Sequence, residues 1–155
     1  MHRYQILIEY VGTHYVGWQI QKKGNSIQKT VQLALSRLLK EKIKLYGSGR
    51  TDAGVHALEQ SAHFDVKNKI QNIDKTIKSL NFFLNKKMIS IINIKKKNIN
   101  FHARHSAKER IYLYIINNRL SPSIVNKDRE WHVRKKLNIS LIKRGAKKLL
   151  GTHDF

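Results

Sequence analysis

The feature that most constrains the fold of this chain is the order in which its apolar patterns change. In the first 94 residues, strand-like patterns, meaning alternation or β-branched runs, occur in four segments, and amphipathic helical spacing occurs in two. In chain order these are a strand at Arg3–Val11, a helix from Ser26 to Leu39, strands at Lys44–Tyr46 and Leu58–Val66, a helix from Asn72 or Asp74 to Leu84, and a strand at Met88–Ile94. This β-α-β-β-α-β order predicts an α+β, ferredoxin-like fold: an antiparallel sheet with two helices on one face.

Net charge is the second constraint. The 155 residues include 31 Lys and Arg against 10 Asp and Glu, which gives a formal net charge of +21. The basic excess is strongest between Trp131 and His153, where no acidic residue occurs. Each Lys or Arg placed on a phosphate releases counterions, so this charge predicts a nucleic-acid partner. A genome that favours Lys, Ile and Asn is the alternative explanation of the same composition.

Cysteine is absent, which excludes disulfides, thiolate nucleophiles and cysteine-ligated metals. No apolar run approaches the ~20 residues of a membrane span. The N-terminal sequence MHRYQ lacks the apolar stretch of a signal peptide. We therefore expect a cytoplasmic protein that has no membrane partner.

The chain beyond the sixth predicted element changes character. It contains a basic, polar segment at Lys95–Ser106, strands at Glu109–Asn117 and Trp131–Val133, and a helix at Asn138–Leu150 that Gly151 ends. One strand pair and one helix bury little by themselves. We therefore expect three parts: an N-terminal ferredoxin-like domain at 1–96, a basic linker that contacts RNA at 97–106, and the start of an incomplete, similar α/β domain at 107–155.

The segment Gly47–Ala57 is the most unusual stretch, because three glycines surround an Arg-x-Asp pair between two predicted strands. Glycine permits positive φ and the close approach of a ligand. Arg50, within reach of Asp52, would hold that carboxylate ionised and oriented, as a carboxylate nucleophile requires. The alternative is a tight turn with a local ion pair.

His102-Ala103-Arg104-His105 contains two histidines that invite comparison with a metal site. In an extended segment their rings point to opposite faces, and no acidic residue lies beside them. The pattern therefore favours contact with RNA phosphate or a base over a metal.

Aromatic residues occur at two further places of interest. In the predicted strand Glu109–Asn117, Tyr112 and Tyr114 share a face with Arg110, which suits a platform for stacking on a base. A strand buried on both faces is the alternative. Trp18, beside Gln19 in a glycine-bearing connection, either contacts a ligand or anchors its loop.

The chain resembles the TruA-type tRNA pseudouridine synthases in five ordered blocks. These are Ile8-Glu9-Tyr10 with Gly12, Tyr15–Gln21, Gly49–Ala57, Phe101–Arg104 and Arg110–Tyr114. The Gly-Arg-Thr-Asp-Ala-Gly sequence within the third block is the most diagnostic. The resemblance implies conversion of uridine to pseudouridine in the anticodon arm of tRNA, with no cofactor and no metal.

The resemblance also implies roles for individual residues. Asp52 would be the catalytic carboxylate, and Arg50 would pair with it and help to flip the nucleotide out of its stack. Tyr112 would stack on the flipped base and help to remove the C5 proton. The implied RNA contacts are Phe101, His102, Ala103, Arg104 and His105, with Trp18 and Gln19, and the basic helix Asn138–Leu150 would add sequence-independent attraction.

The resemblance covers the first half of the family's pattern and the opening of the second. We therefore expect the chain to be C-terminally truncated relative to the family, and to form a homodimer if the C-terminal half is present. The alternative function is a truncated RNA-binding module of the same lineage with impaired catalysis. An RRM would require a Gly-Phe-Gly-Phe-like block, which is absent, and a basic ribosome-associated protein would leave the Asp52 loop unexplained.

Overall fold

The computed structural model describes residues 1–154, which divide into two compact units. The first unit is Met1–Arg110, and the second begins at Ile111. Each unit is described by itself.

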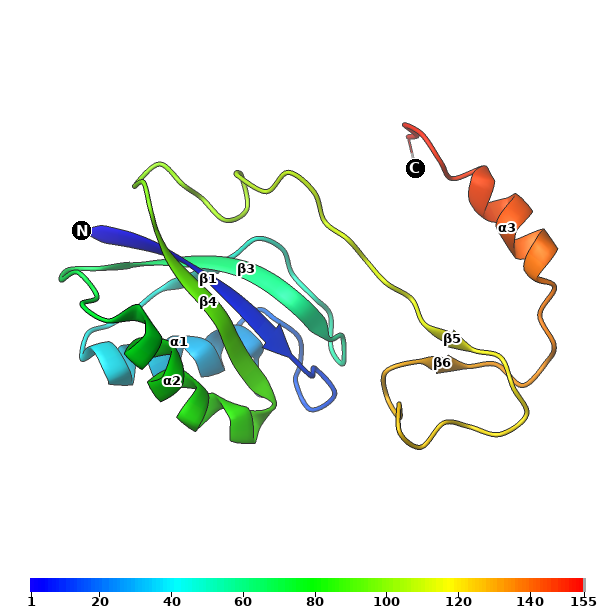
Figure 1. Cartoon of the computed structure of the whole chain (residues 1–155), viewed down its shortest axis with the longest axis horizontal. Helices are drawn as coiled ribbons and strands as arrows, with labels where there is room; N and C mark the ends of the chain where they lie inside the picture. The colour runs from blue at the N-terminus through cyan, green and yellow to red at the C-terminus, as the bar shows by residue number, and fades with distance from the viewer. Residues whose placement is uncertain (155) are drawn as a thin grey trace. The chain divides into compact units, whose positions relative to one another are not determined.

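The first unit contains a four-stranded sheet and two α-helices. Its elements are β1 (His2–Tyr10), α1 (Ile27–Leu39), β2 (Leu45–Gly47), β3 (Ala57–Val66), α2 (Ile73–Leu84), the short 3₁₀ helix η1 (Asn85–Lys87) and β4 (Ile89–Lys97). The strand order is β2-β3-β1-β4, and all neighbouring strands are antiparallel. Both helices lie on the same side of the sheet (Figure 1). The predicted ferredoxin-like architecture is therefore confirmed.

The core lies between this sheet and the two helices. Alternate residues of β1 point toward the helices, and α1 contributes one residue per turn or so to the same layer. The buried side chains include Tyr4, Ile6, Ile8, Tyr10, Ile27, Val31, Leu35, Phe64, Leu80 and Leu84. Each such residue stabilises the fold by about 1.5–3 kcal/mol relative to exposure. The remaining β1 positions, beginning with Arg3 and Gln5, occupy the opposite face, which we call the open face.

α1 begins after the predicted cap Ser26, and of the two starts predicted for α2, Asn72 and Asp74, the structure has Asn72 as the cap. Ser26 caps α1, where its Oγ accepts a hydrogen bond from the amide of Lys29 at 3.3 Å. Asn72 caps α2 through its Oδ1, which accepts from the amide of Lys75 at 2.8 Å. These bonds satisfy amides that have no partner within the helix. Among residues 1–154, no helix is long and apolar enough to cross a membrane.

The second unit has little regular structure. It contains the parallel pair β5 (Ile116–Asn117) and β6 (Trp131–His132), followed by α3 (Ile139–Lys147), which Asn138 caps. The predicted strand Glu109–Asn117 is wrong except for its last two residues. A strand requires hydrogen bonds to a partner along its length, and here they begin only at the carbonyl of Ile115, which accepts from the amide of Trp131 at 2.8 Å. None of the side chains at 111–154 is buried.

Candidate active site

Asp52 lies on the surface of the loop that joins β2 to β3. Its side chain and that of Arg50 are exposed. The backbone turns immediately after Asp52, where the amide of Val55 donates to the Asp52 carbonyl at 3.2 Å and Gly54 has a φ of +79°. Only glycine adopts this conformation readily, so the turn directs the loop back toward β3 and leaves Asp52 exposed at its first position.

A second loop, residues 11–24, braces this one. The amide of Trp18 donates to the carbonyl of Thr51 at 3.0 Å, and the amide of Gly54 donates to the carbonyl of Tyr15 at 3.3 Å. The hydroxyls of Tyr10 and Thr51 are 2.7 Å apart. The backbone is therefore held on both sides of Asp52, which limits the range of positions that its carboxylate can take.

The bracing requires glycine at two positions. A Cβ on Gly12 would lie 2.0 Å from the carbonyl oxygen of Val55, and a Cβ on Gly17 would lie 2.6 Å from that of Thr51. Gly17 also has a φ of +103°. The two loops pack backbone against backbone, and side chains at these positions would separate them.

Trp18 is the anchor beneath this contact. It is 2% exposed, and its ring lies so close to Gly47 that a Cβ there would come within 2.6 Å. The structure therefore favours the loop-anchor interpretation of Trp18. Gln19, its neighbour, is exposed. Burial raises the pKa of the nearby Tyr10 phenol, against a smaller opposing effect of its hydrogen bond to Thr51.

The predicted ion pair between Arg50 and Asp52 does not form. Among the described residues, Arg3 forms an ion pair with Asp65, whereas Arg50 and Asp52 form none with each other. Exposed ion pairs contribute only about 0–1 kcal/mol, so hydration of the two exposed groups competes with pairing. Arg50 and Asp52 share the loop as separate, solvent-facing groups.

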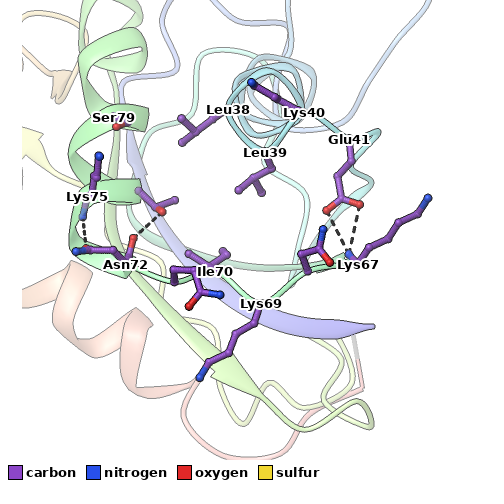
Figure 2. Close-up of a pocket in the computed structure, with 13 residues that line it drawn as sticks. Leu38, Leu39, Lys40, Glu41, Lys67, Lys69, Ile70, Asn72, Lys75 and Ser79 are labelled. Carbon is purple, nitrogen blue, oxygen red and sulfur yellow. Dashed lines mark hydrogen bonds between the residues drawn. The ribbon is translucent and has the colours of Figure 1, made fainter.

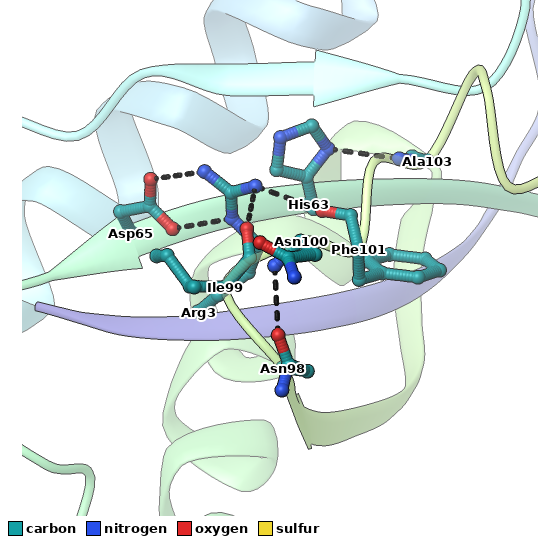
Figure 3. Close-up of polar contacts among 8 residues, drawn as sticks. All are labelled: Arg3, His63, Asp65, Asn98, Ile99, Asn100, Phe101 and Ala103. Atoms are coloured by element: carbon teal, nitrogen blue, oxygen red, sulfur yellow. Dashed lines mark hydrogen bonds and ion pairs between the residues drawn. The ribbon is translucent and has the colours of Figure 1, made fainter.

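Beyond the end of β4 at Lys97, the predicted linker packs along the open face of the sheet, and we call residues 98–106 the open-face segment. Ala103 is 2% exposed, and Figure 3 shows the carbonyls and amide of residues 99–103 directed toward Arg3 and His63. Arg104 and His105 are exposed. The segment therefore presents one basic side chain and one imidazole from an ordered backbone.

The predicted divergence of His102 and His105 is wrong. Their ring centroids are 4.4 Å apart, because residues 102–106 form a turn closed by the amide of Ser106 on the carbonyl of His102 at 2.7 Å. Within residues 1–154, no group of three or more His, Cys, Asp or Glu side chains is arranged to hold a metal. Burial, followed by the charge of nearby His105, lowers the pKa of His102.

Arg110 connects this segment to the Asp52 loop. One of its guanidinium nitrogens donates to the carbonyl of Ser48 at 3.0 Å and to that of Arg104 at 3.4 Å. Gln60 supports the same loop by donating to the carbonyl of Gly49 at 2.8 Å. The sequence pattern predicts Arg110 on a strand face with Tyr112. No local pattern indicates its hydrogen bond to Ser48, because the two residues are 62 apart in sequence.

Tyr112 belongs to the second unit. It is 66% exposed and precedes β5, outside any strand. Phe101–His105, Asp52 and Arg50 all belong to the first unit.

A groove on the helix side of the first unit carries four lysines but no convergent site. It is lined by the end of α1 and the start of α2, with Lys40, Lys67, Lys69 and Lys75 around it. In Figure 2 these side chains point in different directions, and Glu41 accepts from the amide of Lys67. The side-chain oxygen of Asn72 is engaged in capping α2. We assign no ligand to this groove.

Comparison with known proteins gives one consistent result. The family model for tRNA pseudouridine synthase matches residues 6–106. A tRNA pseudouridine synthase A of Pelagibacter ubique is 66% identical over 155 residues, and those of Neorickettsia sennetsu and Anaplasma phagocytophilum are 44% and 40% identical over 153 and 156 residues. These alignments cover 99% or 100% of this chain but 63% of each relative, so the chain spans just under two thirds of their length. The matched region contains the braced Asp52 loop and the segment along the open face, and the chain belongs to the tRNA pseudouridine synthase family.

Proposed function

We propose that this chain binds tRNA and isomerises uridine to pseudouridine in the anticodon arm, with Asp52 as the catalytic carboxylate. The observation that carries the proposal is the position of Asp52 within the matched region. It lies exposed at the start of a turn whose neighbouring residues are fixed by hydrogen bonds. An accessible group on a restrained backbone is what a catalytic role requires.

The reaction sets the tasks of the site. The bond between N1 of the base and C1′ of the ribose breaks, the base turns, and a bond forms between C5 and C1′. The proton leaves C5 and N1 gains one, so atoms and electrons balance without an external oxidant or reductant. A carboxylate at Asp52 would engage the ribose or the base while the base is detached.

The target atoms are inaccessible while the nucleotide remains stacked, so the nucleotide must be extruded. We assign Arg50 to this step, because it is exposed two residues from Asp52 and carries a charge that attracts the phosphate backbone. Tyr112 would stack on the extruded base and assist removal of the C5 proton. Its exposure leaves the ring free for such a contact.

Binding of the rest of the tRNA would fall to the basic surface. Arg104 and His105 are exposed at the end of the open-face segment, with Phe101, His102 and Gln19 as further proposed RNA contacts. Ala103 and Trp18, both 2% exposed, would support these contacts without touching the RNA themselves. The formal charge of +21 supports sequence-independent attraction to phosphate. We further propose that the enzyme acts in the cytoplasm and forms a homodimer if the C-terminal half of the family's pattern is present. Sedimentation of the chain with and without that half would test the dimer.

The test is tritium release from tRNA labelled at uridine C5. We expect release with the wild-type chain and none with Asp52→Asn, while tRNA affinity stays within about a factor of ten, since the substitution removes a reacting group and not the basic surface. Asp74→Asn removes an exposed carboxylate from α2 and is the matched control, which should retain release.

Normal release by Asp52→Asn would refute the assignment of Asp52. Salt-sensitive tRNA binding by a wild-type chain that releases no tritium would favour the alternative, an RNA-binding module without catalysis.

A further inference from the structure

Arg3, at the start of β1, joins three parts of the first unit. Its Nε and Nη2 donate to the two carboxylate oxygens of Asp65 on β3, at 2.8 and 2.7 Å. Its Nη1 donates to the carbonyls of Ile99 at 2.6 Å and Phe101 at 2.8 Å. The carboxylate fixes the plane of the guanidinium, and the fixed guanidinium in turn holds two carbonyls of the open-face segment (Figure 3).

His63, two residues before Asp65 on the same strand, holds the next point of the segment. Its Nδ1 accepts a hydrogen bond from the amide of Ala103 at 3.1 Å, and both residues are 2% exposed. Burial, with the nearby charges of Arg3 and His102, lowers the pKa of His63 to about 4, against a smaller opposing effect of Asp65. The ring is therefore neutral at physiological pH, and Nδ1 is free to accept.

The segment is thus held at every second residue, through Ile99, Phe101 and Ala103. The two bonds from the charged Arg3 guanidinium stabilise the position of the segment more than bonds between neutral groups would. The exposed Arg104 directly follows the last of these points, and its carbonyl accepts a hydrogen bond from Arg110. The backbone that carries Arg104 is therefore held on both sides.

We propose that Arg3, Asp65 and His63, which we call the sheet bracket, are positioning residues that fix the open-face segment so that Arg104 and His105 meet the phosphate backbone of the substrate RNA. This inference rests on the proposed function, because it specifies how the same enzyme binds its RNA. None of the three bracket residues contacts RNA in this proposal. They act through the segment.

The sign of one charge change distinguishes positioning from simple electrostatics. Asp65→Asn removes a negative charge from a protein that binds a polyanion, so electrostatics alone predicts tighter binding. Loss of the bracket predicts weaker binding, because Arg104 would have to be ordered at the moment of contact. The matched control is Glu59→Gln, which removes an exposed carboxylate from the same strand without touching the bracket.

The experiment measures affinity for an anticodon-arm RNA with the full chain and its variants. We expect Asp65→Asn to weaken binding by about tenfold and Arg3→Lys, which keeps the charge but loses the fork, by about threefold or more. Glu59→Gln should bind as the wild type does, or slightly more tightly. Hydrogen exchange at the amide of Ala103, in the absence of RNA, should accelerate by at least about tenfold in both bracket variants.

A double-mutant cycle with Arg104→Ala tests whether the bracket acts through the segment. Arg104→Ala should weaken binding in the wild-type background and have a much smaller effect in the Asp65→Asn background, because the unfixed arginine contributes little. Circular dichroism checks that each variant is folded. Arg3→Lys, which preserves the net charge, supplies the second measurement if Asp65→Asn does not fold.

The two proposals fail in different ways. A wild-type chain that binds no RNA refutes the proposed function and the bracket with it. Wild-type binding that both bracket variants retain, or additive effects in the cycle with Arg104→Ala, refutes the bracket alone.

Discussion

The two units of this chain use similar sequence patterns with different results. β1 and residues 109–117 both show strand-like alternation, yet β1 is paired on both edges and buried on one face. Residues 111–115 are all exposed and lie outside the strands of the second unit. α1 and α3 are both capped amphipathic helices, but only α1 buries an apolar face. Periodicity determines which face of an element is apolar. Stability depends on a second apolar face that covers it.

The largest expected difference between the two units is in the rate of amide hydrogen exchange. Amides in the middle of β1 should exchange at least about 10³ times more slowly than those at 111–115, because their opening requires unfolding of the core. Exchange followed by mass spectrometry, scaled against the chemically unfolded chain, measures both regions at once. Equal protection would show that the second unit has a core of its own.

Truncation of a large apolar side chain should destabilise the protein in the first unit and have little effect in the second. Phe64 is fully buried and stacks on Tyr4 with ring centroids 5.9 Å apart, so Phe64→Ala should lower the free energy of unfolding by about 3–5 kcal/mol. Leu113→Ala, at a residue 73% exposed, should change it by less than about 0.5 kcal/mol. Urea unfolding measures both. If Phe64→Ala does not fold, Phe64→Leu supplies a milder test and should still be destabilising. Comparable losses for Phe64→Ala and Leu113→Ala would contradict the comparison.

The acid dependence of stability should originate largely in the bracket. The pKa of His63 is lowered from 6.5 to about 4 in the folded protein, mainly by burial. Between these values the unfolded chain binds a proton that the folded chain excludes, so stability is complete above pH 6.5 and falls as the pH drops toward 4, by about 2 kcal/mol.

The Arg3 guanidinium lowers the pKa of the Asp65 carboxyl in the folded protein. The stability that the ionised carboxylate contributes is therefore complete above the ordinary carboxyl pKa. It is lost as the pH falls through the lowered pKa of the folded state. Urea unfolding at a series of pH values measures the profile. His63→Gln should flatten it between pH 6.5 and 4. An unchanged slope would assign the acid sensitivity to other groups.

Alanine substitutions at two glycines should change the free energy of unfolding by small amounts and in opposite directions. A Cβ on Gly54 or on Gly145 would meet no atom within 4 Å, but Gly54 has a φ of +79° and Gly145 lies inside α3. Gly54→Ala should destabilise the first unit by about 1–2 kcal/mol, whereas Gly145→Ala should stabilise α3 by about 0.5–1 kcal/mol. Urea unfolding and helical circular dichroism measure the two effects, and the same sign for both would contradict the backbone argument.

Much of the first unit follows from local sequence. The caps Ser26 and Asn72 are recognisable because each precedes an apolar helical pattern, and the order of elements then restricts the sheet to a few arrangements. Asp52 was predictable as a candidate because an Arg-x-Asp pair between glycines is unusual in a connection between strands. Residues 109–117 were mispredicted, because alternation alone does not supply a strand with a partner.

The sequence by itself determined the elements of the first unit, the face of each that is apolar, and the loop that carries Asp52. Only the tertiary structure decided that Trp18 is an anchor, that Arg50 and Asp52 remain apart, and that Arg3 pairs with Asp65. Arg3 and Asp65 are 62 residues apart in sequence, and His63 and Ala103 are 40 apart. Local patterns act over a few residues, whereas these contacts exist only once strand register brings distant backbone positions together.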